Sequence, residues 1–95
     1  MHPEETVSVT REQVAEAVRG IIRTDLKFDG MELPDNLALV GDGLGLDSLD
    51  LLMIVTGIEK RFQHKIPQRK LNRDTMSTVG RFIDFAHAEL VAAGK

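Results

Sequence analysis

A serine stands between two carboxylates at the point where a glycine-rich stretch becomes leucine-rich. Within Gly43–Leu52, which reads GLGLDSLDLL, Ser48 follows Asp47 directly and precedes Asp50 by two residues. A serine hydroxyl acts as a nucleophile only where a base activates it. The histidines are distant in the sequence, and GLDSL lacks the glycines that lie two residues before and after the serine of a nucleophile elbow. We therefore do not expect Ser48 to be catalytic.

Two other roles remain open for Ser48. Serine is a common helix-capping residue, and composition alone favours that role. The other role is covalent attachment, because a hydroxyl at a helix N-terminus can carry a phosphodiester where free backbone N–H groups and the helix dipole favour an anion. The flanking carboxylates of Asp47 and Asp50 would oppose that charge slightly.

The elements that position this serine are helices, since apolar residues recur at three- and four-residue steps in three segments. Each segment begins with a capping residue, and the first also carries the capping box Thr10–Gln13. The predicted helices cover Arg11–Thr24, a second helix from the N-cap Asp47 to Phe62, and a last helix from Ser77 or Thr78 to near Gly94.

The segments between these helices lack helical periodicity. Residues 25–46 are predicted as a long loop with Leu33, Leu37 and Leu39 as apolar anchors, and loops of this length inside compact domains are usually functional. Residues 68–76 read as a short helical turn or loop. No alternating strand pattern occurs, so the fold class is all-α, a small helical bundle.

The second helix is apolar on nearly all sides, which a domain of 95 residues can hardly bury. One stripe is predicted to face the core and the other to form an exposed patch, unless the long loop folds over it. The glycine at position 57 suggests close packing by the same loop. The core stripe is Leu51, Ile54, Val55, Ile58 and Phe62; the second stripe is Leu49, Leu52 and Met53, fading into Thr56 and Lys60.

Composition narrows the possible functions. The chain has no cysteine, and His2, His64 and His87 lack ligand spacing, so neither disulfides nor a metal site is expected. The N-terminus does not resemble a signal peptide and no apolar run could span a bilayer, so we expect a cytoplasmic protein without an integral membrane segment. One domain over residues 1–95 is predicted, with a flexible tail at 1–9 and fraying at 92–95.

At this point the residues resemble a known family. Gly45–Asp50 is similar to the Asp-Ser-Leu signature of acyl carrier proteins, in which the serine bears 4'-phosphopantetheine. Phe62–Pro67, which reads FQHKIP, resembles the Phe-x-x-x-Ile-Pro that follows the family's second helix. Ser77–Val79 resembles the Thr-Val opening of its last helix, and the order of elements is similar from about Glu12 to Leu90.

The resemblance implies a four-helix bundle with a short third helix, and a carrier that is not itself an enzyme. Its 4'-phosphopantetheine would be covalently attached to Ser48, between Asp47 and Leu49, and would hold acyl groups for fatty acid, lipid or polyketide biosynthesis. The implied partners are a phosphopantetheinyl transferase and acyl-loading, condensing and transferase enzymes, which meet a monomeric carrier. The expected partner-binding residues are Leu49, Asp50, Leu52, Met53, Thr56, Glu59 and Lys60.

Two alternatives stay open: an unmodified subunit used only for protein interactions, and an aminoacyl carrier of a nonribosomal-peptide-type pathway. Charge separates this chain from strongly acidic relatives of the family. Residues 1–56 carry 4 basic and 11 acidic side chains, whereas residues 57–95 carry 8 basic and 4 acidic ones. The basic residues at 60–73 form either a solvated face or a surface for a specialised partner set, and nucleic acid is not expected because no aromatic platform accompanies them. They are Lys60, Arg61, Lys65, Arg69, Lys70 and Arg73.

Overall fold

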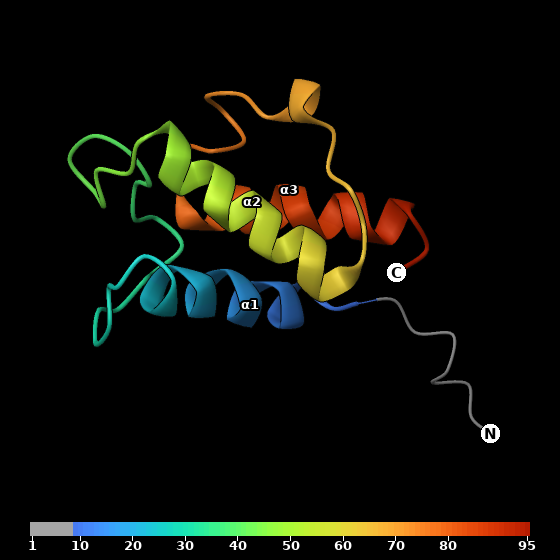
Figure 1. Ribbon diagram of the computed structural model, residues 1–95, viewed down its shortest axis with the longest axis horizontal. Helices are drawn as coiled ribbons and strands as arrows, with labels where there is room; N and C mark the ends of the chain where they lie inside the picture. The colour runs from blue at the N-terminus through green and yellow to red at the C-terminus, as the bar shows by residue number, and fades with distance from the viewer. Residues whose placement is uncertain (1–8) are drawn as a thin grey trace.

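The computed structural model describes residues 9–95, and its regular elements are helices. Figure 1 shows α1 on one side of α2, with α3 behind α2. Within residues 9–95 no strand forms, and the only β-type pairing is an isolated bridge between Ala38 and Thr78. The all-α prediction is therefore confirmed. The elements are α1 (Arg11–Thr24), α2 (Ser48–Phe62), the 3₁₀ helix η2 (Gln68–Lys70) and α3 (Val79–Ala92).

The short third helix that the resemblance implied is only the single turn η2. Pro67 precedes this turn in an extended conformation, and Leu71 returns to extended backbone with φ −85° and ψ 124°. The chain therefore leaves the helical region after one turn, and residues 9–95 contain three α-helices rather than four.

Each α-helix starts at a residue whose side chain satisfies an amide of the first turn. Thr10 and Gln13 form the predicted capping box of α1, and Asp47 and Asp50 form another at α2. Thr78, one of the two predicted candidates, caps α3. Such caps stabilise a helix by about 1 kcal/mol. The starts of the three α-helices could therefore be predicted from the local sequence.

The core lies between the inner faces of the three helices and is closed by leucines of the long loop. The apolar residues that recur at helical spacing in α3 are buried, and so are the middle residues of the α2 stripe. Those of α3 are Val79, Phe82, Ile83, Ala86 and Leu90. Leu51 and Phe62, at the two ends of that stripe, are only half-buried. The largest fully buried side chains are Phe82, Ile21, Ile22, Leu39, Ile54, Ile58, Ile83, Leu90, Val14, Val18 and Val79.

Arginines of α1 hold the first half of the long loop. Arg19 donates from Nε to the carbonyl of Leu33 at 2.7 Å, and its Nη2 contacts Asp35 at 2.5 Å. Asp35 also accepts from Arg11 at 3.0 Å, and its carbonyl accepts the N–H of Gly80 at 2.8 Å. A Cβ at position 80 would lie 2.7 Å from the Cβ of Asp35. The loop is thus clamped between α1 and the start of α3.

The second half of the loop folds back on itself before α2. Leu39 donates its N–H to the carbonyl of Ser77 at 3.0 Å, and Leu46 donates to the carbonyl of Leu39 at 2.9 Å. Gly43 passes so close to Ala38 that a Cβ there would lie 2.0 Å from the Ala38 carbonyl oxygen. These contacts fix the chain directly before the start of α2.

Gly57 packs against α1, not against the long loop as the sequence suggested. A Cβ at this position would lie 2.6 Å from Cδ1 of Ile21, a side chain that is 1% exposed. The glycine therefore allows α1 and α2 to approach closely. Apolar spacing identified the buried positions but did not reveal which element covers them.

Both ends of the described chain are hydrogen-bonded. Val9 is buried, its N–H donates to the carbonyl of Lys95 at 3.0 Å, and its carbonyl accepts from Nε2 of His87 at 3.0 Å. Lys95 in turn donates its N–H to the carbonyl of Leu90 at 2.9 Å. Val9 and residues 93–95 are thus hydrogen-bonded to α3 or to each other, and the flexible tail at 1–9 and the fraying at 92–95 stay predictions. Residues 1–8 of the predicted tail, including His2, lie outside the described residues.

Candidate functional site

Ser48 is the first residue of α2, and the capping box determines how it is presented. Asp47 is the N-cap: its Oδ1 accepts the N–H of Asp50 at 2.9 Å, and Oδ2 of Asp50 accepts the N–H of Asp47 at 3.3 Å. Asp47, and not Ser48, therefore caps the helix. The two carboxylates flanking Ser48 accept hydrogen bonds from backbone N–H groups on either side of it, and neither is bonded to the Ser48 hydroxyl.

The Ser48 hydroxyl is exposed and makes no hydrogen bond to any other residue within 9–95. Of the histidines in that part of the chain, His87 contacts the Val9 carbonyl and His64 lines a hollow at the opposite end of α2. Neither lines the surface around Ser48, so no histidine among residues 9–95 lies in position to act as a base for its hydroxyl. The arrangement presents a free hydroxyl at the positive end of a helix dipole.

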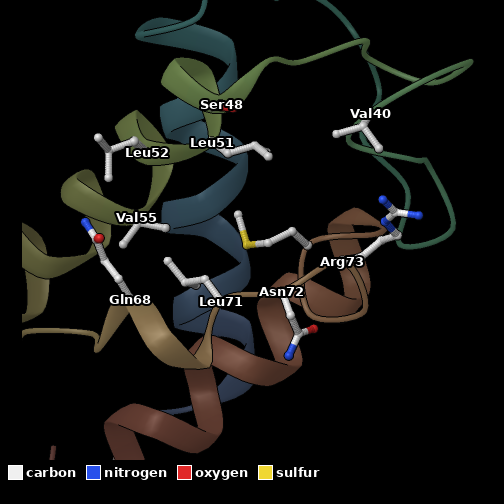
Figure 2. A pocket seen from close by; sticks show the side chains of 10 residues that line it. Val40, Ser48, Leu51, Leu52, Val55, Gln68, Leu71, Asn72 and Arg73 are labelled. Atoms are coloured by element: carbon white, nitrogen blue, oxygen red, sulfur yellow. The ribbon is translucent and has the colours of Figure 1, made fainter.

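A groove of about 680 Å³ runs from Ser48 along α2. Figure 2 shows the side chains of Leu51 and Leu71 pointing into it, with Val40 and Arg73 on the side away from α2. Its walls are mainly apolar, with polar groups at positions 68, 72 and 73. The lining residues are Val40, Ser48, Leu51, Leu52, Val55, Gln68, Leu71, Asn72, Arg73 and Met76.

Sequence reasoning missed the far wall of this groove. Val40 belongs to the long loop, and Leu71 and Met76 lie in the segment before α3. These residues lie at no regular spacing from Ser48 in the sequence, and they come to lie opposite α2 only in the folded chain. No local pattern in the sequence could have grouped them.

The second stripe of α2 is exposed as expected. Leu49 is 70% exposed, Leu52 42% and Met53 44%, so the long loop does not cover them. Thr56 and Lys60 continue the same side of the helix at three- and four-residue steps and are half-buried and exposed, respectively. A chain of this size thus presents three large apolar side chains beside an exposed hydroxyl.

Glu59, expected among the partner-binding residues, has a structural contact. Its Oε2 accepts the N–H of Ile66 at 2.7 Å, and the side chain is half-buried. This hydrogen bond holds the chain that leaves α2 against the last turn of the helix. Asp50 is likewise engaged in the capping box, whereas Leu49, Leu52 and Met53 remain available to a partner.

The basic residues at positions 60–73 are not equivalent. Nζ of Lys70 pairs with Glu89 of α3 at 3.1 Å. Lys60, Lys65 and Arg69 are exposed and form no ion pair with another residue of the described chain. Arg73 is also exposed and lines the groove together with Ser48.

Within residues 9–95 no cluster of histidine and carboxylate side chains could hold a metal ion. In the same part of the chain, none of the helices has the length and apolar character needed to cross a bilayer.

The sequence of the chain is similar to those of known proteins over most of its length. Residues 16–86 match the family model described as phosphopantetheine attachment site. The chain is 32% identical over 81 residues to an acyl carrier protein of Thermotoga maritima, which covers 85% of this chain and 96% of the relative. It is 31% identical over 78 residues to an acyl carrier protein of Clostridium acetobutylicum, covering 80% and 97%, respectively.

An acyl carrier protein of Tropheryma whipplei strain Twist is 30% identical over 79 residues, covering 83% of this chain and 93% of the relative. No solved structure matches the chain significantly. The family model and these relatives each span most of the chain. The cofactor of the family is phosphopantetheine, held covalently on a serine. The chain therefore belongs to the acyl carrier protein family.

Proposed function

We propose that Ser48 is the phosphopantetheine attachment residue and that the protein carries acyl groups as thioesters on this arm. The region matched by the family model contains two serines, Ser48 and Ser77. Ser77 is half-buried, and its hydroxyl donates to the carbonyl of Asp74 at 2.9 Å. The Ser48 hydroxyl is exposed and uncommitted, and this difference carries the assignment.

Attachment requires a phosphopantetheinyl transferase and coenzyme A. Oγ of Ser48 loses its proton and attacks the phosphorus next to the pantetheine, the pyrophosphate P–O bond breaks, and adenosine 3',5'-bisphosphate leaves. The product is a phosphodiester on Ser48. The first amides of α2 have no intrahelical acceptor, and they and the helix dipole favour an anion at this position.

The residues around Ser48 fit such a group. The Asp47–Asp50 capping box keeps the start of α2 rigid, so the arm leaves from a defined point. The apolar walls of the groove give a short acyl chain a place to rest, and the polar side chains at positions 68, 72 and 73 offer hydrogen-bonding partners to the amides of the arm. When bound, phosphopantetheine supplies the thiol that accepts the acyl group.

The proposed role is transport of acyl intermediates between separate enzymes of fatty acid, lipid or polyketide biosynthesis, and the chain itself catalyses no step. A flexible arm raises the effective concentration of cargo at a docked enzyme, and a small interface lets the carrier leave afterwards. The exposed side chains of Leu49, Leu52 and Met53 lie next to Ser48 and provide that interface.

The decisive experiment uses the absence of cysteine from the chain. Incubation with a phosphopantetheinyl transferase and coenzyme A should add one phosphopantetheine by intact-mass spectrometry and one thiol by titration. The untreated protein should show none. Ser48→Ala should remain unmodified, whereas Ser77→Ala should be modified like the wild type.

Modification that persists in Ser48→Ala would disprove the assignment. A protein that stays unmodified both in vitro and when isolated from its native cell would instead support the interaction subunit. Intact mass of the acylated protein from that cell also identifies the cargo, including an aminoacyl group.

A further inference from the structure

The surface next to the Ser48 groove is basic, although the chain as a whole carries a formal charge of −3. Residues 57–73 hold six basic side chains and one acidic side chain, a formal charge of +5. The acidic side chain is Glu59, which is half-buried and engaged with the Ile66 N–H. Lys70 is paired with Glu89. The charges left for an external partner are therefore those of the remaining cations.

Four of these cations lie on the α2 stripe or on the opposite bank of the groove. Lys60 lies on the stripe itself, four residues after Thr56. Lys65, Arg69 and Arg73 belong to the segment that runs beside α2 and forms the opposite bank of the groove. We name these four residues the basic rim.

The rim and the Ser48 groove belong to one continuous surface. The groove shares Leu52, Val55 and Gln68 with a second hollow of about 560 Å³, which Lys65 also lines. That hollow shares Lys65 with a third hollow of about 420 Å³, which Lys60 lines. An enzyme that reaches Ser48 and covers the apolar stripe of α2 must therefore approach the basic rim.

We propose that the basic rim selects partner enzymes whose carrier-docking surface is acidic around an apolar centre. This inference rests on the proposed carrier function. An apolar stripe alone would accept any apolar surface of similar shape, whereas exposed charges at its border set association rates and exclude partners of the same sign. Because these cations are exposed, their effect is screened by salt over about 8 to 10 Å.

The test uses one phosphopantetheinyl transferase in two engineered forms, with glutamates or with lysines around its carrier-binding surface. Both forms act on the wild-type chain at low and high salt, and thiol labelling of the product gives kcat/KM. We expect kcat/KM to be about tenfold higher with the acidic form at low salt, and this preference to shrink at high salt.

The variant Lys60→Glu/Lys65→Glu should lose or reverse that preference. Its control is Lys27→Glu/Lys95→Glu, which changes the net charge equally at two exposed positions that line neither the groove nor the hollows. The control should keep the wild-type preference, which separates the rim from the total charge. Circular dichroism should show that both variants are folded.

Equal kcat/KM with the two transferase forms would overturn the rim proposal while leaving the carrier function intact. Absence of modification by either form would instead overturn the carrier function. Binding of the unmodified wild-type chain to vesicles containing phosphatidylglycerol, lost in Lys60→Glu/Lys65→Glu but kept in the control, would assign the rim to a membrane surface and also overturn the proposal.

Discussion

Ser48 differs from an ordinary surface serine because the side chains of its acidic neighbours are hydrogen-bonded to the backbone, whereas its own hydroxyl is not hydrogen-bonded to another described residue. Asp47 and Asp50 exchange hydrogen bonds with each other's backbone amides. A serine in place of Asp47 could also cap the helix, but it would add a second hydroxyl at the helix start. The carboxylate caps thus leave one hydroxyl at the N-terminus of α2 and hold it in a defined position.

The role of Asp47 can be divided into hydrogen bonding and charge. Asp47→Ala removes the cap and should lower the free energy of unfolding by about 1 kcal/mol, whereas Asp47→Asn keeps a capping oxygen and should change it little. Urea titration followed by circular dichroism measures both. We expect Asp47→Ala to be modified more slowly by the transferase, since the start of α2 frays.

Asp47→Asn then tests how the negative charge of Asp47 alone affects the rate of modification. Because the proposed modification would form an anionic phosphodiester next to residue 47, loss of the carboxylate should leave the modification rate unchanged or raise it. If Asp47→Asn is modified as slowly as Asp47→Ala, the carboxylate acts on the transferase and not through the capping box.

At the scale of the element, α2 combines two functions on opposite sides. Ile54, Val55 and Ile58 are buried in the core, while Leu49 and Met53 face solvent. Helical spacing predicted both stripes, because three- and four-residue steps determine which residues share a side. It could not predict that α1 covers Gly57 or that the ends of the core stripe are half-buried, since these depend on where the neighbouring elements stop.

Substitutions on the two sides of α2 should therefore have different effects. Ile54→Ala and Ile58→Ala should lower the free energy of unfolding by about 2 to 5 kcal/mol, because each leaves a cavity in the core. Leu49→Ala and Met53→Ala should change it by less than about 0.5 kcal/mol. Chemical denaturation measures these values, and modification and acyl-transfer rates report on function.

The exposed substitutions should slow transfer while the protein stays folded. Equal destabilisation by the two pairs of variants would mean that α2 is rotated from the orientation described above. Phe62→Ala provides an intermediate case, and we expect a smaller loss than at Ile58 because Phe62 is half-buried.

At the scale of the whole molecule, the long loop links distant parts of the chain to the site. The clamp at Asp35 joins α1, the loop and the start of α3, and the contacts at Leu39 and Leu46 continue to Asp47. The sequence predicted a long loop with leucine anchors but not its route. Glycine and proline mark where regular structure ends, whereas the ion pairs that hold a loop depend on residues far away in the chain.

Gly80→Ala should loosen this clamp. The new Cβ would meet Asp35 at 2.7 Å, so the loop must shift, and we expect a loss of about 1 to 3 kcal/mol in the free energy of unfolding. Hydrogen exchange should show faster exchange at the amides of Leu39 and Leu46 than in the wild type. Gly20→Ala is the control: no atom lies within 4 Å of its added Cβ, and alanine in mid-helix should stabilise by about 0.5 to 1 kcal/mol. Unchanged exchange in Gly80→Ala would show that the clamp does not support the loop.

The hydrogen bond between Val9 and Lys95 has a practical consequence for how the carrier can be joined to other proteins. It brings the two ends of the described chain together, and Figure 1 shows the start of α1 and the C-terminus on one side and the start of α2 on the other. A fusion partner, or a support used for immobilisation, attached at residue 95 would therefore stand away from the groove. Ser48 and the proposed arm would then still reach an enzyme in solution.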